Sequence, residues 1–210
     1  MEKQNLIITI GRQYGSGGAE VGKKLGQRMG LDVYDKEIQK MTSDESGIRE
    51  SYFHLADERA GKKLLYKIVQ SLIPENTSPS TGSDMVSADN LFRFQSAVIR
   101  RLAQEESCIF IGRCADHVLR DFPNKFDFFI HGSIEDRIKR IQSCGDYEIE
   151  GKTPQASLEK MDKQRSTYYN YYTGKVWGKC DHYDMCINAG RLGVEHSVDI
   201  ILEYVNRLKK

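Results

Sequence analysis

A chain of 210 residues with 39% hydrophobic and 29% charged residues is predicted to be one soluble, globular domain rather than a disordered segment. The net charge of +1 gives no general attraction to nucleic acid or membranes, so neither is expected as a partner. The start of the chain lacks signal-peptide architecture, and no apolar run approaches the roughly 18 residues that span a bilayer. Five widely spaced cysteines without a CxxC pair predict reduced thiols in a cytoplasmic protein.

Short apolar runs rich in β-branched or aromatic residues predict buried parallel strands. In chain order they are Leu6–Ile10, the weaker Asp32–Tyr34, Cys108–Ile111, Phe126–Ile130 and Met185–Ile187. Amphipathic helices are predicted at Ala19–Met29, Ile134–Ile141 and His196–Leu208. This alternation of strand and helix implies an α/β fold, with an open parallel sheet covered by helices on both faces.

The stretch 36–106 contains no convincing strand and is predicted to be helical. Leu64–Leu72 and Leu91–Leu102 have helical patterns. Between them, Pro74–Ser87 is rich in Pro, Ser, Thr, Asn and Gly, which predicts a mobile loop. A second polar stretch, Cys144–Pro154, is also predicted to be mobile.

A glycine-rich segment, Gly11–Ala19, joins the first predicted strand to the first predicted helix. Glycine permits backbone conformations that turn successive N–H groups toward an anion. The following helix adds its unpaired amides and the positive end of its dipole. We therefore predict a phosphate-binding loop at Gln13–Ala19, with a tight turn that binds no ligand as the alternative.

The segment departs from the phosphate-loop pattern G-x-x-x-x-G-K-[ST] at three positions. With Gly17 as the second glycine, Arg12 replaces the first glycine, Gly18 the lysine, and Ala19 the hydroxyl residue. The lysine ordinarily contacts the β- and γ-phosphates, and the hydroxyl holds Mg²⁺. Arg12 or a lysine of the following helix could supply the missing charge, although a solvated helix face is the simpler interpretation of those lysines.

Four segments together resemble the cytidylate kinase-like family, a branch of the P-loop nucleoside monophosphate kinases whose members often lack the loop lysine. They are Ile8–Gly18, Ile109–Ala115, Asp136–Ile141 and Asp162–Asn188, in the order of the family and over nearly the whole chain. The resemblance implies a three-layer αβα P-loop kinase fold with a parallel five-stranded sheet. It also implies a single domain, 1–210, with a helical acceptor-binding insertion at 36–106 and a lid region at 137–167.

The resemblance implies roles for three arginines. Arg113, in Gly112-Arg113-Cys114, corresponds to an arginine that contacts the acceptor phosphate in true cytidylate kinases, a task suited to a bidentate guanidinium. Arg137 and Arg140 correspond to lid arginines that stabilise charge on the phosphoryl group during transfer. A surface ion pair for Arg113 and a solvated basic stripe for the other two are the structural alternatives.

Asp162 and Arg165 resemble the cluster that follows the lid, where an aspartate reads the cytosine edge and an arginine holds the acceptor phosphate. Arg165 thereby joins Arg137 and Arg140 as a candidate catalytic residue. The spacing of Asp162 and Arg165 also fits a helix-surface ion pair. Asp35 follows the second strand, where these kinases place the acceptor, although the serine and Tyr-Arg pair of true cytidylate kinases are missing there.

Aromatic residues gather toward the end of the chain, at Tyr168, Tyr169, Tyr171, Tyr172 and Trp177. Such rings could stack on a base. A cluster of this kind more often packs a lid or the contact of a homodimer, and we favour packing.

Two functions are consistent with these residues. The first is a phosphotransferase that moves the γ-phosphoryl group of ATP, with Mg²⁺, to a nucleoside monophosphate such as CMP or to another small acceptor; ATP and Mg²⁺ are implied by the resemblance. The second is a nucleotide-binding or sensing protein without catalysis, because the loop lacks its lysine and its hydroxyl. No histidine or cysteine spacing predicts a metal site. In both cases the nucleotide-binding residues are Arg12, Gln13, Tyr14, Gly15, Ser16, Gly17, Gly18 and Ala19.

Overall fold

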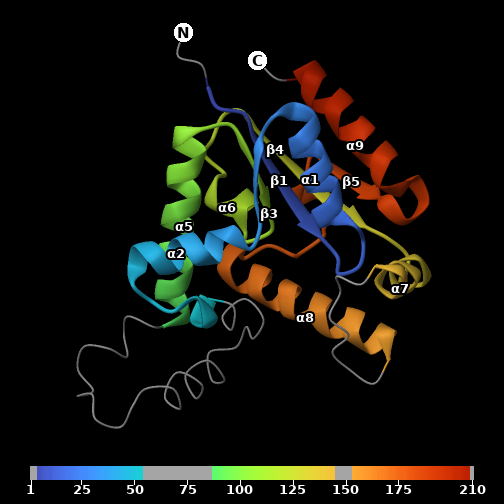
Figure 1. Cartoon of the computed structure of the whole chain (residues 1–210), viewed down its shortest axis with the longest axis horizontal. Coiled ribbons are helices and arrows are strands. Elements are labelled where there is room, and N and C mark those ends of the chain that lie inside the picture. Colours follow the sequence, from blue (N-terminus) through green and yellow to red (C-terminus); the bar gives the residue numbers. More distant parts are fainter. Residues whose placement is uncertain (1–3, 54–86, 145–152, 209–210) are drawn as a thin grey trace.

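The structure is a computed structural model, and it describes residues 4–53, 87–144 and 153–208. Five parallel strands form one sheet in the order β2-β3-β1-β4-β5 (Figure 1). They are β1 (Ile7–Arg12), β2 (Asp32–Tyr34), β3 (Cys108–Ile111), β4 (Lys125–His131) and β5 (Met185–Asn188). The predicted parallel sheet is therefore confirmed, with β1 and β4 extending beyond their predicted ends.

Helices cover both faces of the sheet and one of its ends. Figure 1 shows α1 and α9 on one face, α5 and α6 on the other, and α8 running across the end toward which β1 points. The helices are α1 (Gly18–Met29), α2 (Glu37–Ser46), α5 (Ala88–Glu105), α6 (Ala115–Val118), α7 (Ile134–Ser143), α8 (Pro154–Thr173) and α9 (Ala189–Leu208), with a short 3₁₀ helix at Cys180–His182. The arrangement is the predicted three-layer αβα fold.

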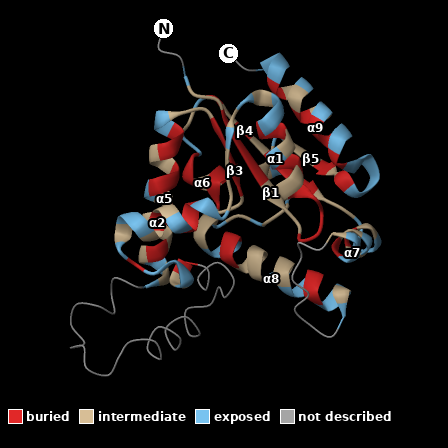
Figure 2. Ribbon diagram, in the orientation of Figure 1, coloured by how far each residue is buried: buried red, intermediate tan, exposed pale blue. Residues whose placement is uncertain are grey.

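The first core lies between the sheet and the pair α1 and α9. The apolar positions of α1 recur every four residues, so Val21 and Leu25 face the same way and are both fully buried. They pack with Val198 and Ile201 of α9 against β1 and β4. Figure 2 shows this buried band running through the sheet, with exposed residues on the outer sides of the helices.

The second core lies on the opposite face, under α5, α6 and the start of α2. Val98, Ile99 and Leu102 of α5 meet Phe110 of β3 in this core. Ile38 of α2 completes it, and at 0% exposure it anchors the helix that follows β2. The position of the β2–α2 turn, which carries Asp35, is therefore set by this packing.

Most predicted helices are confirmed, with bounds that differ. The predicted helix His196–Leu208 is the second part of α9, which begins earlier and has a break at Gly193. Helix α2 lies within the stretch 36–106 that is predicted to be helical, although no separate helix is predicted at its position, and α8 is not predicted as a helix. The predicted helix Leu64–Leu72, positions 74–86 of the predicted loop, and positions 145–152 of the second polar stretch lie outside the described residues, and Pro154 is the first residue of α8. Within the described parts of 36–106 there is no strand, as predicted.

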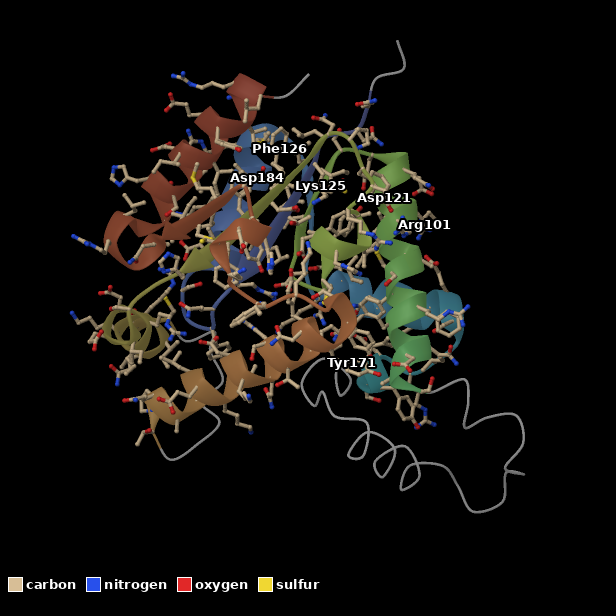
Figure 3. All side chains as sticks on the ribbon, turned by 180° about the vertical axis from the view of Figure 1, so that it is seen from behind. Arg101, Asp121, Lys125, Phe126, Tyr171 and Asp184 are labelled. Atoms are coloured by element: carbon tan, nitrogen blue, oxygen red, sulfur yellow. The ribbon has the colours of Figure 1, made fainter. Side chains whose placement is uncertain are left out.

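All five strands end at the same edge of the sheet because they are parallel. In sheets of this type, ligands bind outside the carboxyl ends of the strands, next to the place where the strand order reverses. Here β1 lies between β3 and β4, so its end at Arg12 marks that place. Figure 3 shows Lys125, Phe126 and Asp184 at the opposite end of the sheet, far from Tyr171 on α8.

Candidate functional site

A cavity of ≈ 810 Å³ opens at the carboxyl ends of the strands. This volume lies within the range typical of sites for small molecules and cofactors. The glycine-rich loop, the ends of β2 and β3, and α8 form its walls. Six cationic and four acidic side chains line it, namely Arg12, Lys23, Lys36, Arg113, Arg140 and Arg165, and Glu20, Asp35, Glu37 and Asp116. The excess of positive charge suits an anionic ligand.

The loop Gly15–Ala19 has the backbone shape of an anion cradle. Gly15 and Gly17 have φ of +73° and +85°, in the left-handed region that other residues resist. Gly17 caps α1 without a side-chain hydrogen bond. Within the described chain, the amides of Gly15, Gly17, Gly18 and Ala19 donate to no backbone carbonyl. These amides are therefore available to phosphate oxygens at the positive end of the α1 dipole.

The start of the loop is fixed to the strand beside it. The Gln13 amide donates to the Ile130 carbonyl at 3.0 Å, and the Gln13 side-chain oxygen accepts from the Gly132 amide at 3.2 Å. The Ser16 hydroxyl donates to the Gln13 carbonyl at 2.8 Å. Ser16 is buried and does not line the cavity, and its hydrogen bond ties the side chain to the start of the loop.

Tyr14 joins the loop to helices α7 and α8 through its main chain. Its amide donates to Asp162 Oδ1 of α8 at 2.7 Å, and its carbonyl accepts from Arg137 Nη1 of α7 at 3.1 Å. Arg137 Nη1 also donates to Asp162 Oδ2 at 2.6 Å. Arg137 is 6% exposed, and neither it nor Asp162 lines the cavity. In this structure Asp162 pairs with Arg137 rather than forming an ion pair with Arg165.

Arg140, one turn after Arg137 on α7, reaches the cavity. Its guanidinium contacts Glu20 of α1 and lies so close to Gly17 that a Cβ there would be 2.9 Å from Cζ. The Nε atom of Arg140 is buried without a hydrogen-bond partner among the described residues. Arg140 is thus a cation from α7 that lies directly against the first turn of α1.

Arg12, Asp35 and Arg165 meet at the ends of β1 and β2. Arg12 Nη2 donates to Asp35 Oδ1 at 3.1 Å, and Arg165 Nη1 donates to the Arg12 carbonyl at 3.1 Å. The Arg165 guanidinium also lies 5.3 Å from the ring centroid of Tyr14, a cation–π contact. Burial, followed by repulsion from Arg12, lowers the pKa of Arg165 to about 9. Arg165 is therefore a buried guanidinium with a second cation, Arg12, beside it.

Arg113 enters the cavity from a strained turn after β3. Gly112, Arg113 and Cys114 all have positive φ, at +72°, +59° and +54°. A non-glycine residue in the left-handed region of backbone conformation costs of order 1–3 kcal/mol, and here two are consecutive. Such strain is common at functional sites. Burial lowers the pKa of Arg113, an effect that Asp35 opposes and Arg12 reinforces. Arg113 therefore belongs to the same cationic cluster as Arg12 and Arg165.

The aromatic cluster both packs α8 and lines the cavity. Tyr172 stacks on Phe92 of α5 with ring centroids 4.1 Å apart, which supports the packing interpretation. Tyr168, Tyr169 and Trp177 nonetheless line the cavity. The Tyr169 hydroxyl donates to Asp116 Oδ2 at 2.6 Å, and burial, followed by the charge of Asp116, raises the pKa of Tyr169.

The structure brings most of the predicted site residues to one cavity. Arg12, Gln13, Tyr14, Gly15, Gly17, Gly18, Ala19, Asp35, Arg113, Arg140 and Arg165 line it, whereas Ser16, Arg137 and Asp162 do not. Their chemical roles stay predictions. The sequence analysis did not single out Gln164 or Gln39, which also line the cavity. Gln164 Oε1 is buried without a partner in the described chain, and an isolated glutamine in a polar helix gives no sequence signal.

The residues present fit a nucleotide better than they fit a resident metal ion. The free loop amides and the surrounding arginines suit phosphate oxygens. Ala19 offers no oxygen where Mg²⁺ would be held, and the described residues contain no group of three His, Cys, Asp or Glu residues able to hold a metal. Mg²⁺ commonly binds through substrate phosphates, water and one or two carboxylates, and Glu20 and Asp35 are carboxylates on this cavity.

A parallel sheet in the order 2-3-1-4-5, with a glycine loop between its first strand and first helix, defines the class as the P-loop kinase fold. Solved structures of kinases have a similar fold. A shikimate kinase from Bacteroides thetaiotaomicron is 12% identical with a TM-score of 0.56, covering 96% of this chain and 98% of its own. A deoxyadenosine kinase from M. mycoides, solved with dCMP and dCDP, is 14% identical with a TM-score of 0.51. The match covers 97% of this chain and 100% of the deoxyadenosine kinase chain.

The chain belongs to the cytidylate kinase-like family, whose sequence profile matches residues 7–191. An uncharacterized protein from Eubacterium ventriosum ATCC 27560 is 30% identical with a TM-score of 0.66, covering 96% of this chain and 99% of its own. No curated protein matched the sequence. Family membership implies nucleotide binding. Among the described helices, none has both the length and the apolar character needed to cross a bilayer.

Proposed function

We propose that the protein is a phosphotransferase that moves the γ-phosphoryl group of ATP to a small acceptor bearing an anionic group, such as a nucleoside monophosphate. The observation that carries the proposal is a single cavity in which a free-amide glycine loop faces arginines from three other elements. Phosphoryl transfer depends mainly on positioning and charge neutralisation, which such a cavity provides. Bound ATP with Mg²⁺ would supply the phosphoryl group and its counter-charge.

The protein's own residues divide the work by position. The residues that bind the donor phosphates through backbone amides are Gly15, Gly17, Gly18 and Ala19. Arg113 follows the end of β3, and Arg165 lies within α8. Together they hold the anionic group of the acceptor beside Asp35. Arg140 approaches the loop from the lid and stabilises charge that develops during transfer. Arg137 and Asp162, which we predicted to act on the substrate, position the loop through Tyr14.

A second candidate function is nucleotide binding or sensing without catalysis. The replacement of the loop lysine by Gly18 and of the hydroxyl by Ala19 favours it. It predicts that nucleotide raises the unfolding temperature, because a ligand that binds only the native state stabilises it, while no ADP is formed.

The test is turnover by the purified chain with ATP and Mg²⁺ over a panel of acceptors. The panel contains nucleoside monophosphates, the matching nucleosides and small phosphate-free hydroxy acids. We expect ADP formation that depends on one class of acceptor. We expect Arg113→Met to raise the acceptor KM by about 10- to 100-fold, the effect of losing a charge-assisted contact. Nucleotide binding without ADP formation from any acceptor would contradict the phosphotransferase and favour the second candidate.

A further inference from the structure

We propose that Arg12 replaces the missing loop lysine and contacts the terminal phosphates of the nucleotide. This inference rests on the proposed nucleotide site and identifies the cation within it. Relative to the usual phosphate-loop pattern, a cationic residue and a glycine have exchanged places. Arg12 stands where a glycine is usual, and Gly18 stands where the lysine is usual.

The two positions compete for the same space. A Cβ atom added at Gly18 would lie 2.5 Å from Arg12 Cβ and 3.0 Å from Arg12 Cγ. Carbon atoms in contact prefer separations of about 3.5–4.0 Å, so a side chain at position 18 cannot coexist with Arg12 in this conformation. The loss of the lysine and the presence of Arg12 are therefore one structural change rather than two.

A second glycine clears the path of the same side chain. A Cβ atom added at Gly112 would lie 1.8 Å from Arg12 Nη1 and 3.0 Å from Cζ. Gly112 also has φ of +72°, so glycine is required there on both steric and conformational grounds. Arg12 thus passes from the end of β1 between Gly18 of the loop and Gly112 of the acceptor side.

The guanidinium is positioned to bind an anion. Nη2 donates to Asp35 at 3.1 Å, and a guanidinium has further N–H donors for phosphate oxygens. The Arg12 side chain is 16% exposed and lines the cavity. Its backbone belongs to β1, where the Gly11 and Arg12 pairing with β4 and the bond from Arg165 hold it in place.

Other cations near the loop are less suited to this role. Lys23 also lines the cavity but is an exposed residue of α1, and Lys24 pairs with Glu195 and Glu20. Arg140 comes from the lid, pairs with Glu20 and lies against Gly17 rather than Gly18. Arg12 is the cation whose side chain lies where the Cβ atom of a residue at position 18 would be.

The test returns positions 12 and 18 to the residue types of the usual phosphate-loop pattern. Four full-length proteins are compared, namely the natural chain, Arg12→Gly, Gly18→Lys and the double variant Arg12→Gly/Gly18→Lys. Calorimetry measures the binding of β,γ-imido-ATP and of inorganic tripolyphosphate, with adenosine as the phosphate-free control. Arg12→Met is included because it keeps part of the aliphatic stem, and thermal unfolding confirms that each variant is folded.

We expect Arg12→Gly and Arg12→Met to weaken both phosphate probes by about 10- to 100-fold, because a hydrogen bond to a charged group is lost. Adenosine binding should stay unchanged. Gly18→Lys alone should also weaken binding, because its side chain meets Arg12. The double variant should regain most of the lost affinity, because a lysine at the usual position then replaces the arginine.

A structural role for Arg12 predicts a different pattern. If Arg12 served only to tie β1 to Asp35, Asp35→Asn would reproduce the loss of phosphate affinity and the double variant would not recover it. Either result overturns the inference. Unchanged phosphate affinity in Arg12→Met overturns it while leaving the proposed function intact. Conversely, Arg12-dependent phosphate binding without turnover supports the inference and contradicts the phosphotransferase. If the natural chain bound neither phosphate probe, the nucleotide site and the inference would both be wrong.

Discussion

Arg137 and Arg140 lie three residues apart on α7, yet their side chains contact different parts of the molecule. Arg137 is 6% exposed and donates to both Asp162 and the Tyr14 carbonyl, so it belongs to the packing of α7 and α8 against the loop. Arg140 lines the cavity, pairs with Glu20 in the first turn of α1 and lies against Gly17. Two arginines that look equivalent in a sequence can therefore be a structural clamp and a candidate catalytic group. The difference comes from their partners, because Asp162 of α8 and the Tyr14 carbonyl bind Arg137, whereas Glu20 of α1 pairs with Arg140.

The largest expected effect concerns the clamp. Arg137→Met should lower the free energy of unfolding by roughly 3–5 kcal/mol, because Asp162 Oδ2 and the Tyr14 carbonyl lose their donor, while Asp162 Oδ1 keeps only the Tyr14 amide. Chemical denaturation measures this, with Arg140→Met as the matched control, for which a loss below about 1 kcal/mol is expected. Equal losses in the two variants would remove the distinction between the arginines. Adding Asp162→Asn to Arg137→Met should recover part of the stability.

The second expected effect concerns the cavity. Arg140→Ala should reduce turnover by about 10²- to 10³-fold, the range seen when one donor to the transition state is removed. The affinity for nucleotide should change far less, because the contact matters most during transfer. Steady-state kinetics and calorimetry on the same protein separate these quantities. A fall in affinity as large as the fall in turnover would make Arg140 a ground-state binding residue instead.

The third effect tests how closely α7 lies against the loop. At Gly15 an added Cβ would be 2.9 Å from Ile141 Cγ2 and 3.1 Å from the Arg137 carbonyl. Gly30 has a similar φ, +66°, but has nothing within 4 Å of an added Cβ. We expect Gly15→Ala to destabilise the fold by about 1–3 kcal/mol more than Gly30→Ala, the cost of crowding alone. Equal costs in denaturation would show that α7 yields at this contact.

The smallest effect concerns the partner of Arg140. Glu20 is 44% exposed in its contact with Arg140, so Glu20→Gln should change stability by less than about 1 kcal/mol. Removing this carboxylate should modestly strengthen the binding of a triphosphate, because the cavity becomes more positive. Calorimetry at low salt would detect the change, which should fade at high salt as screening increases. Weaker binding after the substitution would instead indicate that Glu20 itself contributes to the ligand site.

The sequence predicted the sheet and the backbone conformation of the glycine loop well, because both depend on local patterns, whereas phosphate binding by the loop stays a prediction. Strand hydrophobicity located all five strands, and Gly15 and Gly17 have the backbone conformation that a phosphate loop needs. The helix α8 was missed because buried Ser157, Leu158, Tyr168 and Tyr169 do not form a clear apolar stripe. The separation of Arg137 from Arg140 could not be predicted either, since it depends on Asp162, which is distant in the chain.

The hydrogen bond from the Tyr14 amide to Asp162 spans 148 positions of the sequence and connects the backbone of the loop to α8. The resting shape of the loop is consequently not a property of its glycines alone. A substitution that tilts α8, even one remote from the cavity, would shift Tyr14 and with it the amides that follow. Variation along α8 in related proteins is thus expected to tune nucleotide affinity while the loop sequence stays the same.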